Sequence, residues 1–63
     1  SPQVLDTVGV IQLENRQFTK ALASFESGAR RAAQLQGMAD LQHTIEGHLA
    51  EARQLAGQPA DTP

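Results

Sequence analysis

Large apolar and small residues recur at intervals of three and four positions through the first half of this chain. This spacing places them on one side of a helix. The pattern is interrupted at Asn15-Arg16-Gln17. It predicts two antiparallel helices, over residues 2–14 and 18–35, that pack closely as a hairpin. The residues that carry the pattern are Leu5, Val8, Gly9, Phe18, Ala21, Leu22, Phe25, Gly28 and Ala29.

A third amphipathic helix is predicted over residues 38–56. Its apolar positions again step by three and four residues, and they are Met38, Leu41, Ile45, Leu49, Ala52 and Leu55. The chain is therefore expected to be all-α, with a helical hairpin over 1–35, an amphipathic capping helix over 36–56 and a disordered tail over 57–63.

Several residues indicate where these helices begin and end. Ser1-Pro2 is typical of an N-cap followed by proline at the first helical position. Asn15 is expected to take the left-handed conformation that ends the first helix, and Gly37 ends the second. Gly47 lies inside the third helix, where it either permits a close contact or marks a weak point.

The first helix is apolar nearly all round. At about 100° per residue, one broad face holds Val4, Leu5, Val8, Ile11 and Gln12. Val10 and Leu13 fall on the other side, so we expect these two to lack a partner within the chain. Scattered apolar residues are normal on a surface, and the alternative is an interface with a neighbouring repeat, a second copy or a ligand.

Composition narrows the class of protein. The 63 residues form at most one domain with a marginal core, and no cysteine is present to reinforce it by a disulfide or a thiolate metal site. The net charge of −2 is spread singly, with no basic stripe for nucleic acid or anionic membranes. No apolar run approaches a membrane span, which predicts a soluble chain. Because it opens at Ser1 with helix-starting residues, we expect a segment of a longer protein.

The first 35 residues resemble the tetratricopeptide repeat, a helix–turn–helix unit of about 34 residues. Leu5 stands for the family's first aromatic, Val8-Gly9 for its Leu-Gly pair and Gln12 for its tyrosine. In the second helix Phe18, Ala21-Leu22, Phe25 and Gly28-Ala29 match the family's aromatic and small positions. The departures are Gln12, Arg16 in place of the turn glycine, and Ala33 without the usual proline. The third helix resembles the closing helix of such arrays, with polar residues outward.

The resemblance implies a non-catalytic scaffold or adaptor module that binds a protein or peptide in a groove lined by first helices. The groove-facing residues in this sequence would be Gln3, Asp6, Val10, Leu13 and Glu14. Two acidic residues disfavour a carboxylate clamp and favour an apolar or weakly basic segment. Alternatively, these residues contact the preceding repeat.

No chemistry-bearing constellation is evident. His43 and His48 are five residues apart, so on a helix they point in different directions and cannot share a metal. No glycine-rich phosphate loop and no acid–base–nucleophile trio occurs. We therefore expect no enzyme activity, no metal and no cofactor.

Two further hypotheses remain open beside the adaptor module. In one, two copies of the chain bury the first helix against each other and form a homo-oligomer. In the other, the chain is a regulatory or chaperone-like segment that folds only on its partner, as its aromatic-poor composition suggests.

Overall fold

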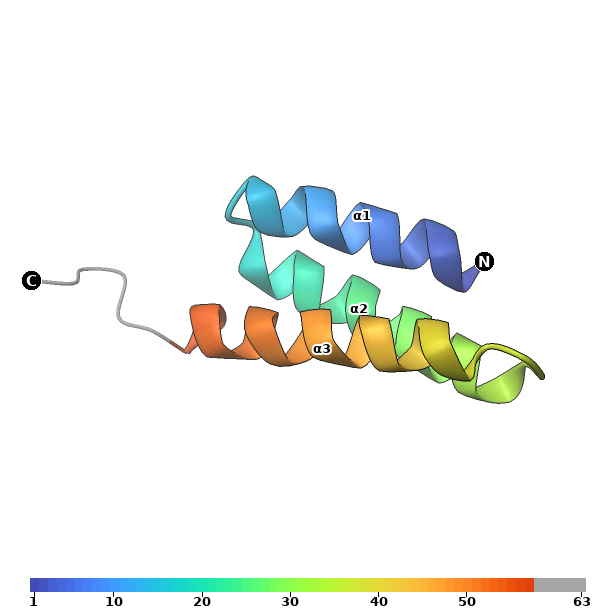
Figure 1. Ribbon diagram of the computed structural model, residues 1–63. Coiled ribbons are helices and arrows are strands. Elements are labelled where there is room, and N and C mark those ends of the chain that lie inside the picture. The colour runs from blue at the N-terminus through green and yellow to red at the C-terminus, as the bar shows by residue number, and fades with distance from the viewer. Residues whose placement is uncertain (58–63) are drawn as a thin grey trace, which may run out of the picture.

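The protein is three α-helices joined by short turns, as seen in a computed structural model that describes residues 1–57 (Figure 1). The helices are α1 (Pro2–Glu14), α2 (Phe18–Gln34) and α3 (Ala39–Ala56). The all-α expectation is confirmed, and each helix begins and ends within one residue of its predicted bound. Gly57 caps the end of α3. The rest of the tail expected to be disordered, 58–63, lies outside the described residues.

The first turn is built by a residue other than the expected one. Ser1 caps α1 as predicted, its side chain accepting a hydrogen bond from the backbone N–H of Val4. Asn15, however, has an ordinary negative φ of −87°, and Arg16 takes the left-handed conformation at φ 61°. Arg16 therefore occupies the strained position itself, and its guanidinium lies 5.4 Å from the centre of the Phe18 ring.

The second turn also differs in detail from the expectation. The last helical residue of α2 is Gln34, and Leu35 is already extended. Gly37 is left-handed at φ 77°, so it reverses the chain three residues after the helix has ended.

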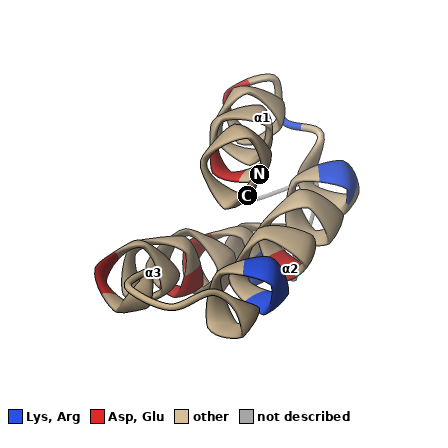
Figure 2. Ribbon diagram, turned by 90° about the vertical axis from the view of Figure 1, so that its right-hand side faces the viewer, with Lys and Arg blue, Asp and Glu red and all other residues tan. Residues whose placement is uncertain are grey.

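α2 is the central helix, and both α1 and α3 pack along it. α1 and α3 meet each other only sparsely, so the three helices form two hairpins that share α2 (Figures 1 and 2). One side of α1 is consequently left without a helix against it.

The core lies where the three helices come closest. Phe25 and Ile45 are the two largest fully buried side chains, and Phe25 has no exposed surface. The remaining buried apolar residues are Ala21, Ala32, Leu49 and Ala52. Phe18, predicted to be core, is only half-buried at the rim. Alanines around one large ring allow backbones to approach closely, which is how so short a chain buries a core.

Gly9 of α1 lies directly against the Phe25 ring. A Cβ at this position would stand 2.5 Å from Cε1 and 2.7 Å from Cδ1 of that ring. Gly28 is also tight, since a Cβ there would be 3.3 Å from Cβ of Leu5. Gly47, in contrast, has nothing within 4 Å of its Cβ position and is exposed, so it is a weak point of α3 and permits no close contact.

Gly9→Ala should lower the free energy of unfolding by about 1–2 kcal/mol, even though alanine is the better helix former. The added methyl group would meet the Phe25 ring, which is fully buried and can move away only by displacing its neighbours. Gly47→Ala is the matched control and should raise stability by about 1 kcal/mol, because only helix propensity changes there. Urea unfolding followed by circular dichroism measures both. A Gly9→Ala variant as stable as the parent would contradict this packing.

The positive φ at Arg16 predicts that glycine gives a more stable protein than alanine at this position. This is the reverse of their order inside a helix. Arg16→Gly should be more stable than Arg16→Ala by about 1 kcal/mol, because only glycine adopts a positive φ without a steric penalty. Both variants lose the contact with Phe18, so that term cancels. At the exposed helical position Ala23, replacement by glycine should instead cost about 1 kcal/mol. Thermal unfolding would reveal equal stabilities at position 16 if the left-handed turn were absent.

Candidate interaction surface on α1

The five residues predicted to bind a partner do not form one exposed surface. Gln3 and Glu14 are exposed, and Asp6 is half-buried. Val10 and Leu13 are partly buried and pack against the core cluster. The expectation that these two lack a partner within the chain is therefore wrong. The physical reason is Gly9, which turns toward Phe25 and brings the neighbouring positions of α1 inward.

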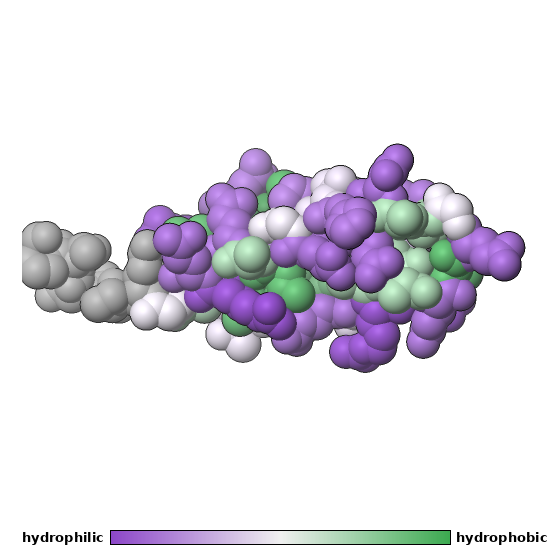
Figure 3. All heavy atoms as spheres, turned by 60° about the horizontal axis from the view of Figure 1, so that its bottom comes forward, coloured by the Kyte–Doolittle hydropathy of each residue, from purple (hydrophilic) through white to green (hydrophobic). Residues whose placement is uncertain are grey.

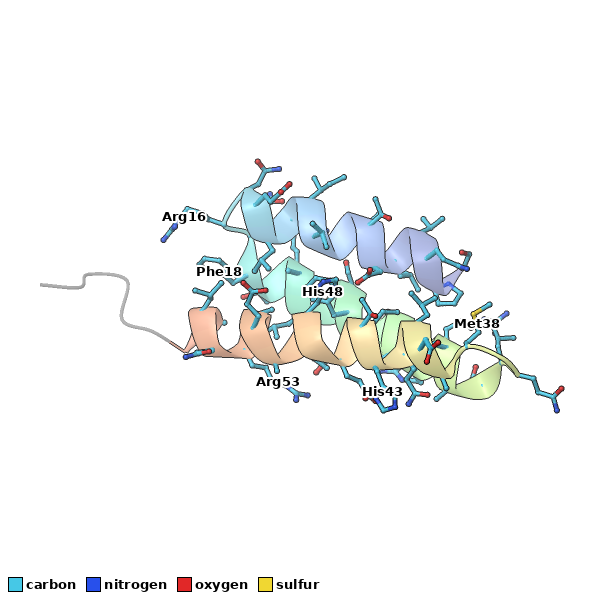
Figure 4. All side chains as sticks on the ribbon, viewed as in Figure 1. Arg16, Phe18, Met38, His43, His48 and Arg53 are labelled. Atoms are coloured by element: carbon cyan, nitrogen blue, oxygen red, sulfur yellow. The ribbon has the colours of Figure 1, made fainter. Side chains whose placement is uncertain are left out.

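Asp6 is held by α3 across the gap between the outer helices. Its carboxylate Oδ1 lies 2.7 Å from Nδ1 of His48, the residue labelled between α1 and α3 in Figure 4. A carboxylate accepts hydrogen bonds, so the ring Nδ1–H is the donor. The His48 ring also lies over Phe25, with centroids 5.4 Å apart and planes tilted by 41°. His48 thus joins α1 to α3 and covers the core ring, a role that its position at the edge of the α3 apolar stripe did not reveal.

A second polar contact joins α1 to α2. The hydroxyl of Ser24 donates a hydrogen bond of 2.6 Å to Oε1 of Gln12, and the pair is partly buried. Gln12 stands where the tetratricopeptide pattern has a tyrosine. Its amide is satisfied across the helix interface by a hydroxyl that periodicity alone does not single out.

The outward side of α1 carries three β-branched apolar side chains in a row. Val4 is 60% exposed, Ile11 51% and Val8 38%. These residues stand at i, i+4 and i+7, which places them on one helical stripe. We call Val4, Val8 and Ile11 the α1 stripe. Leu35 is the one other large apolar residue with comparable exposure among residues 1–57.

The opposite side of the molecule differs in character. Seen from the side of α3, the surface is largely hydrophilic with smaller apolar patches (Figure 3). Arg53 of α3 reaches Glu26 of α2 at 3.7 Å, and His43 lies 3.6 Å from Glu46 on its own helix. Exposed polar contacts of this kind are typical of a solvated face.

Two hollows open on the surface beside α2. One, of about 460 Å³, lies between the start of α1 and the second half of α2 and is lined by Ser1, Leu5, Ser27, Arg30, Arg31 and Gln34. The other, of about 400 Å³, lies at the first turn and is lined by Arg16, Gln17, Phe18, Thr19, Lys20 and Ala56. Both therefore combine apolar and basic side chains.

Residues 1–57 contain no group of three or more His, Cys, Asp or Glu side chains that could hold a metal ion. His43 and His48 have different partners, Glu46 and Asp6. None of the described helices is both long enough and apolar enough to span a lipid bilayer.

Comparison of the chain with models of protein families, with curated proteins and with solved structures finds no match. The residues and their geometry therefore carry the functional argument by themselves.

The contact between Asp6 and His48 should contribute more to stability than an exposed ion pair. In a double-mutant cycle with Asp6→Ala and His48→Ala, we expect a coupling of about 1 kcal/mol, because both groups are partly desolvated. The exposed Glu26–Arg53 pair is the matched control and should show only a few tenths of a kcal/mol. Chemical denaturation of the variants measures both cycles. Equal couplings would mean that Asp6 and His48 contact each other no more firmly than surface groups do.

Proposed function

We propose that this chain is a non-catalytic protein–protein interaction module that binds a partner helix through the α1 stripe. The observation that carries the proposal is the exposure of Val4, Val8 and Ile11 on the side of α1 that neither α2 nor α3 covers. Apolar anchors at i, i+4 and i+7 suit a second helix, whose ridges can lie between them.

The architecture supports a module of the tetratricopeptide type. Two antiparallel helices pack closely through Gly9 and Gly28, with Phe25 between them. These are positions at which the sequence resembles that repeat. A third helix with a polar outer face follows, as at the end of a repeat array. In such an array the α1 stripe would receive a helix of the neighbouring repeat.

Interface size favours a partner helix over a stable dimer formed through α1 alone. Helix α1 has 13 residues and spans about 20 Å. One side of so short a helix offers far less than the roughly 800 Å² that each partner of a standard stable complex buries. A neighbour tethered to the same chain needs less buried area, and a partner that also contacts α2 buries more. Both are therefore favoured over a free second copy that contacts α1 alone.

The test uses a displayed library of helical peptides with a fixed apolar face and randomised flanking positions. We expect binders to the 63-residue chain. Val4→Gln together with Ile11→Gln should abolish their binding, because the apolar anchors are removed without a change in charge. Ala50→Gln on the exposed side of α3 is the control and should leave binding unchanged. All three substitutions lie on exposed helix surface, so circular dichroism should show little change in thermal unfolding.

Two results would contradict the proposal. One is a library that yields no binder to the folded chain. The other is a set of binders whose affinity is unchanged by Val4→Gln together with Ile11→Gln. Sedimentation of the unmodified chain tests the self-association hypothesis in parallel. If the chain forms a homo-oligomer and these substitutions dissociate it, the α1 stripe binds a second copy of the chain.

A further inference from the structure

The charged residues are unevenly divided among the helices. α1 contains acidic Asp6 and Glu14 and no basic residue, and α3 contains three acidic residues with Arg53 alone against them. α2 has the opposite sign, with Lys20, Arg30 and Arg31 against Glu26 (Figure 2). A partner that lies along α1 and touches α2 therefore meets positive charge on that edge.

Arg30 and Arg31 have no carboxylate partner among residues 1–57. Glu26 and Arg30 stand at i and i+4 on α2, a spacing that allows an ion pair on one helix. In the structure Glu26 instead lies 3.7 Å from Arg53 of α3. Arg30 and Arg31 both line the hollow of about 460 Å³ beside α1, together with Ser27 and Gln34, whose side chains can also donate hydrogen bonds.

The hollow reaches helix α1 at Leu5, which is a sequence neighbour of Val4 in the α1 stripe. On the helix Leu5 also lies beside Val8 in the direction of α2. A helix docked on Val4 and Val8 therefore has one edge over the hollow and its two arginines.

We propose that the partner helix is acidic along the edge that faces α2, and that Arg30 and Arg31 receive its carboxylates. This inference rests on the proposed function and specifies the partner's chemistry. Guanidinium groups bind carboxylates through paired N–H donors, and they repel a lysine or arginine at the same place. The α1 stripe then supplies the apolar contact, and the arginine pair sets the orientation of the partner.

This chemistry differs from the one first expected for the chain. The residues Asp6 and Glu14 suggested an apolar or weakly basic ligand, but Asp6 is bonded to His48 and does not border the hollow. The cations adjacent to the exposed apolar residues belong to α2.

The peptide library described above tests this inference through its randomised flanks. Binders selected on the unmodified chain should be enriched in Asp and Glu on one edge. Selection on the double variant Arg30→Gln, Arg31→Gln should retain the apolar face and lose that enrichment. Lys20→Gln is the control for the loss of positive charge, because it removes one cation from α2 about 16 Å away along the helix, beyond the screening length at moderate salt.

Affinities of one selected peptide and its Glu→Gln counterpart make the test quantitative. By fluorescence anisotropy, the acidic peptide should bind the unmodified chain and Lys20→Gln roughly 3- to 10-fold more tightly than the neutral one, as partly exposed ion pairs allow. This difference should shrink at high salt and vanish in the double arginine variant.

The outcomes separate the two proposals. Binders that need Val4 and Ile11 but show no acidic preference would overturn this inference and leave the interaction module standing. A basic preference would overturn it as well. The absence of any binder would overturn the proposed function itself, and self-association through the stripe would replace the acidic partner by a second copy.

Discussion

The contact between the Phe25 ring and the backbone of Gly9 sets the arrangement of the other elements. The ring is fully buried, lies against α1 at a position with no side chain, and is covered from α3 by His48. A single residue of α2 is thus in contact with both neighbouring helices. Because α1 is apolar nearly all round, hydrophobicity alone permits several rotations of this helix, and the fit of ring to glycine selects one.

Polar contacts at the rim of the core fix the same rotation of α1. Asp6 meets His48 of α3, and Gln12 meets Ser24 of α2, from positions on opposite edges of the buried side. Turning α1 about its axis would break both contacts and leave partly buried polar groups unpaired, which costs more than a hydrogen bond contributes when formed. Within residues 1–57, the buried core consists of three alanines and the large side chains Phe25, Ile45 and Leu49. Apart from the fit of Phe25 to Gly9, so small a core does little to fix the rotation of α1, and these hydrogen bonds add to that specification.

The helices themselves could be predicted because the apolar periodicity and the residues typical of helix ends indicate the same segments. Ser1-Pro2 and the break at 15–17 mark helix ends within a residue of those observed, and Gly37 lies three residues after the end of α2. The inward side of α1 could not be predicted from hydropathy, since Gly9 contributes no apolar area yet makes the closest approach to another helix. The choice of Arg16 over Asn15 for the left-handed residue is equally inaccessible to single-residue preference, because closure of the turn decides it.

The exposed side of α1 was predicted incorrectly, although the binding role of its residues stays a prediction. Val10 and Leu13 contribute to the core, whereas Val4, Val8 and Ile11 point away. The signal that could have corrected this is Gly9 itself, since a glycine inside a helix often marks a close approach to a neighbouring element. The partner of Glu26 could not have been predicted from sequence spacing, because its contact with Arg53 depends on how α3 packs against α2.

The chemistry of the outward residues suits a docking surface for a reason that goes beyond their exposure. Valine and isoleucine in a helix occupy largely one χ1 rotamer, so they lose little side-chain freedom when a partner covers them. A row of leucine or methionine would bury similar area but would have to be ordered first. Helix α1, fixed on its inner side by Gly9 and two polar contacts, therefore presents anchors that are already ordered. A short interface with limited area depends on this preorganisation for its affinity.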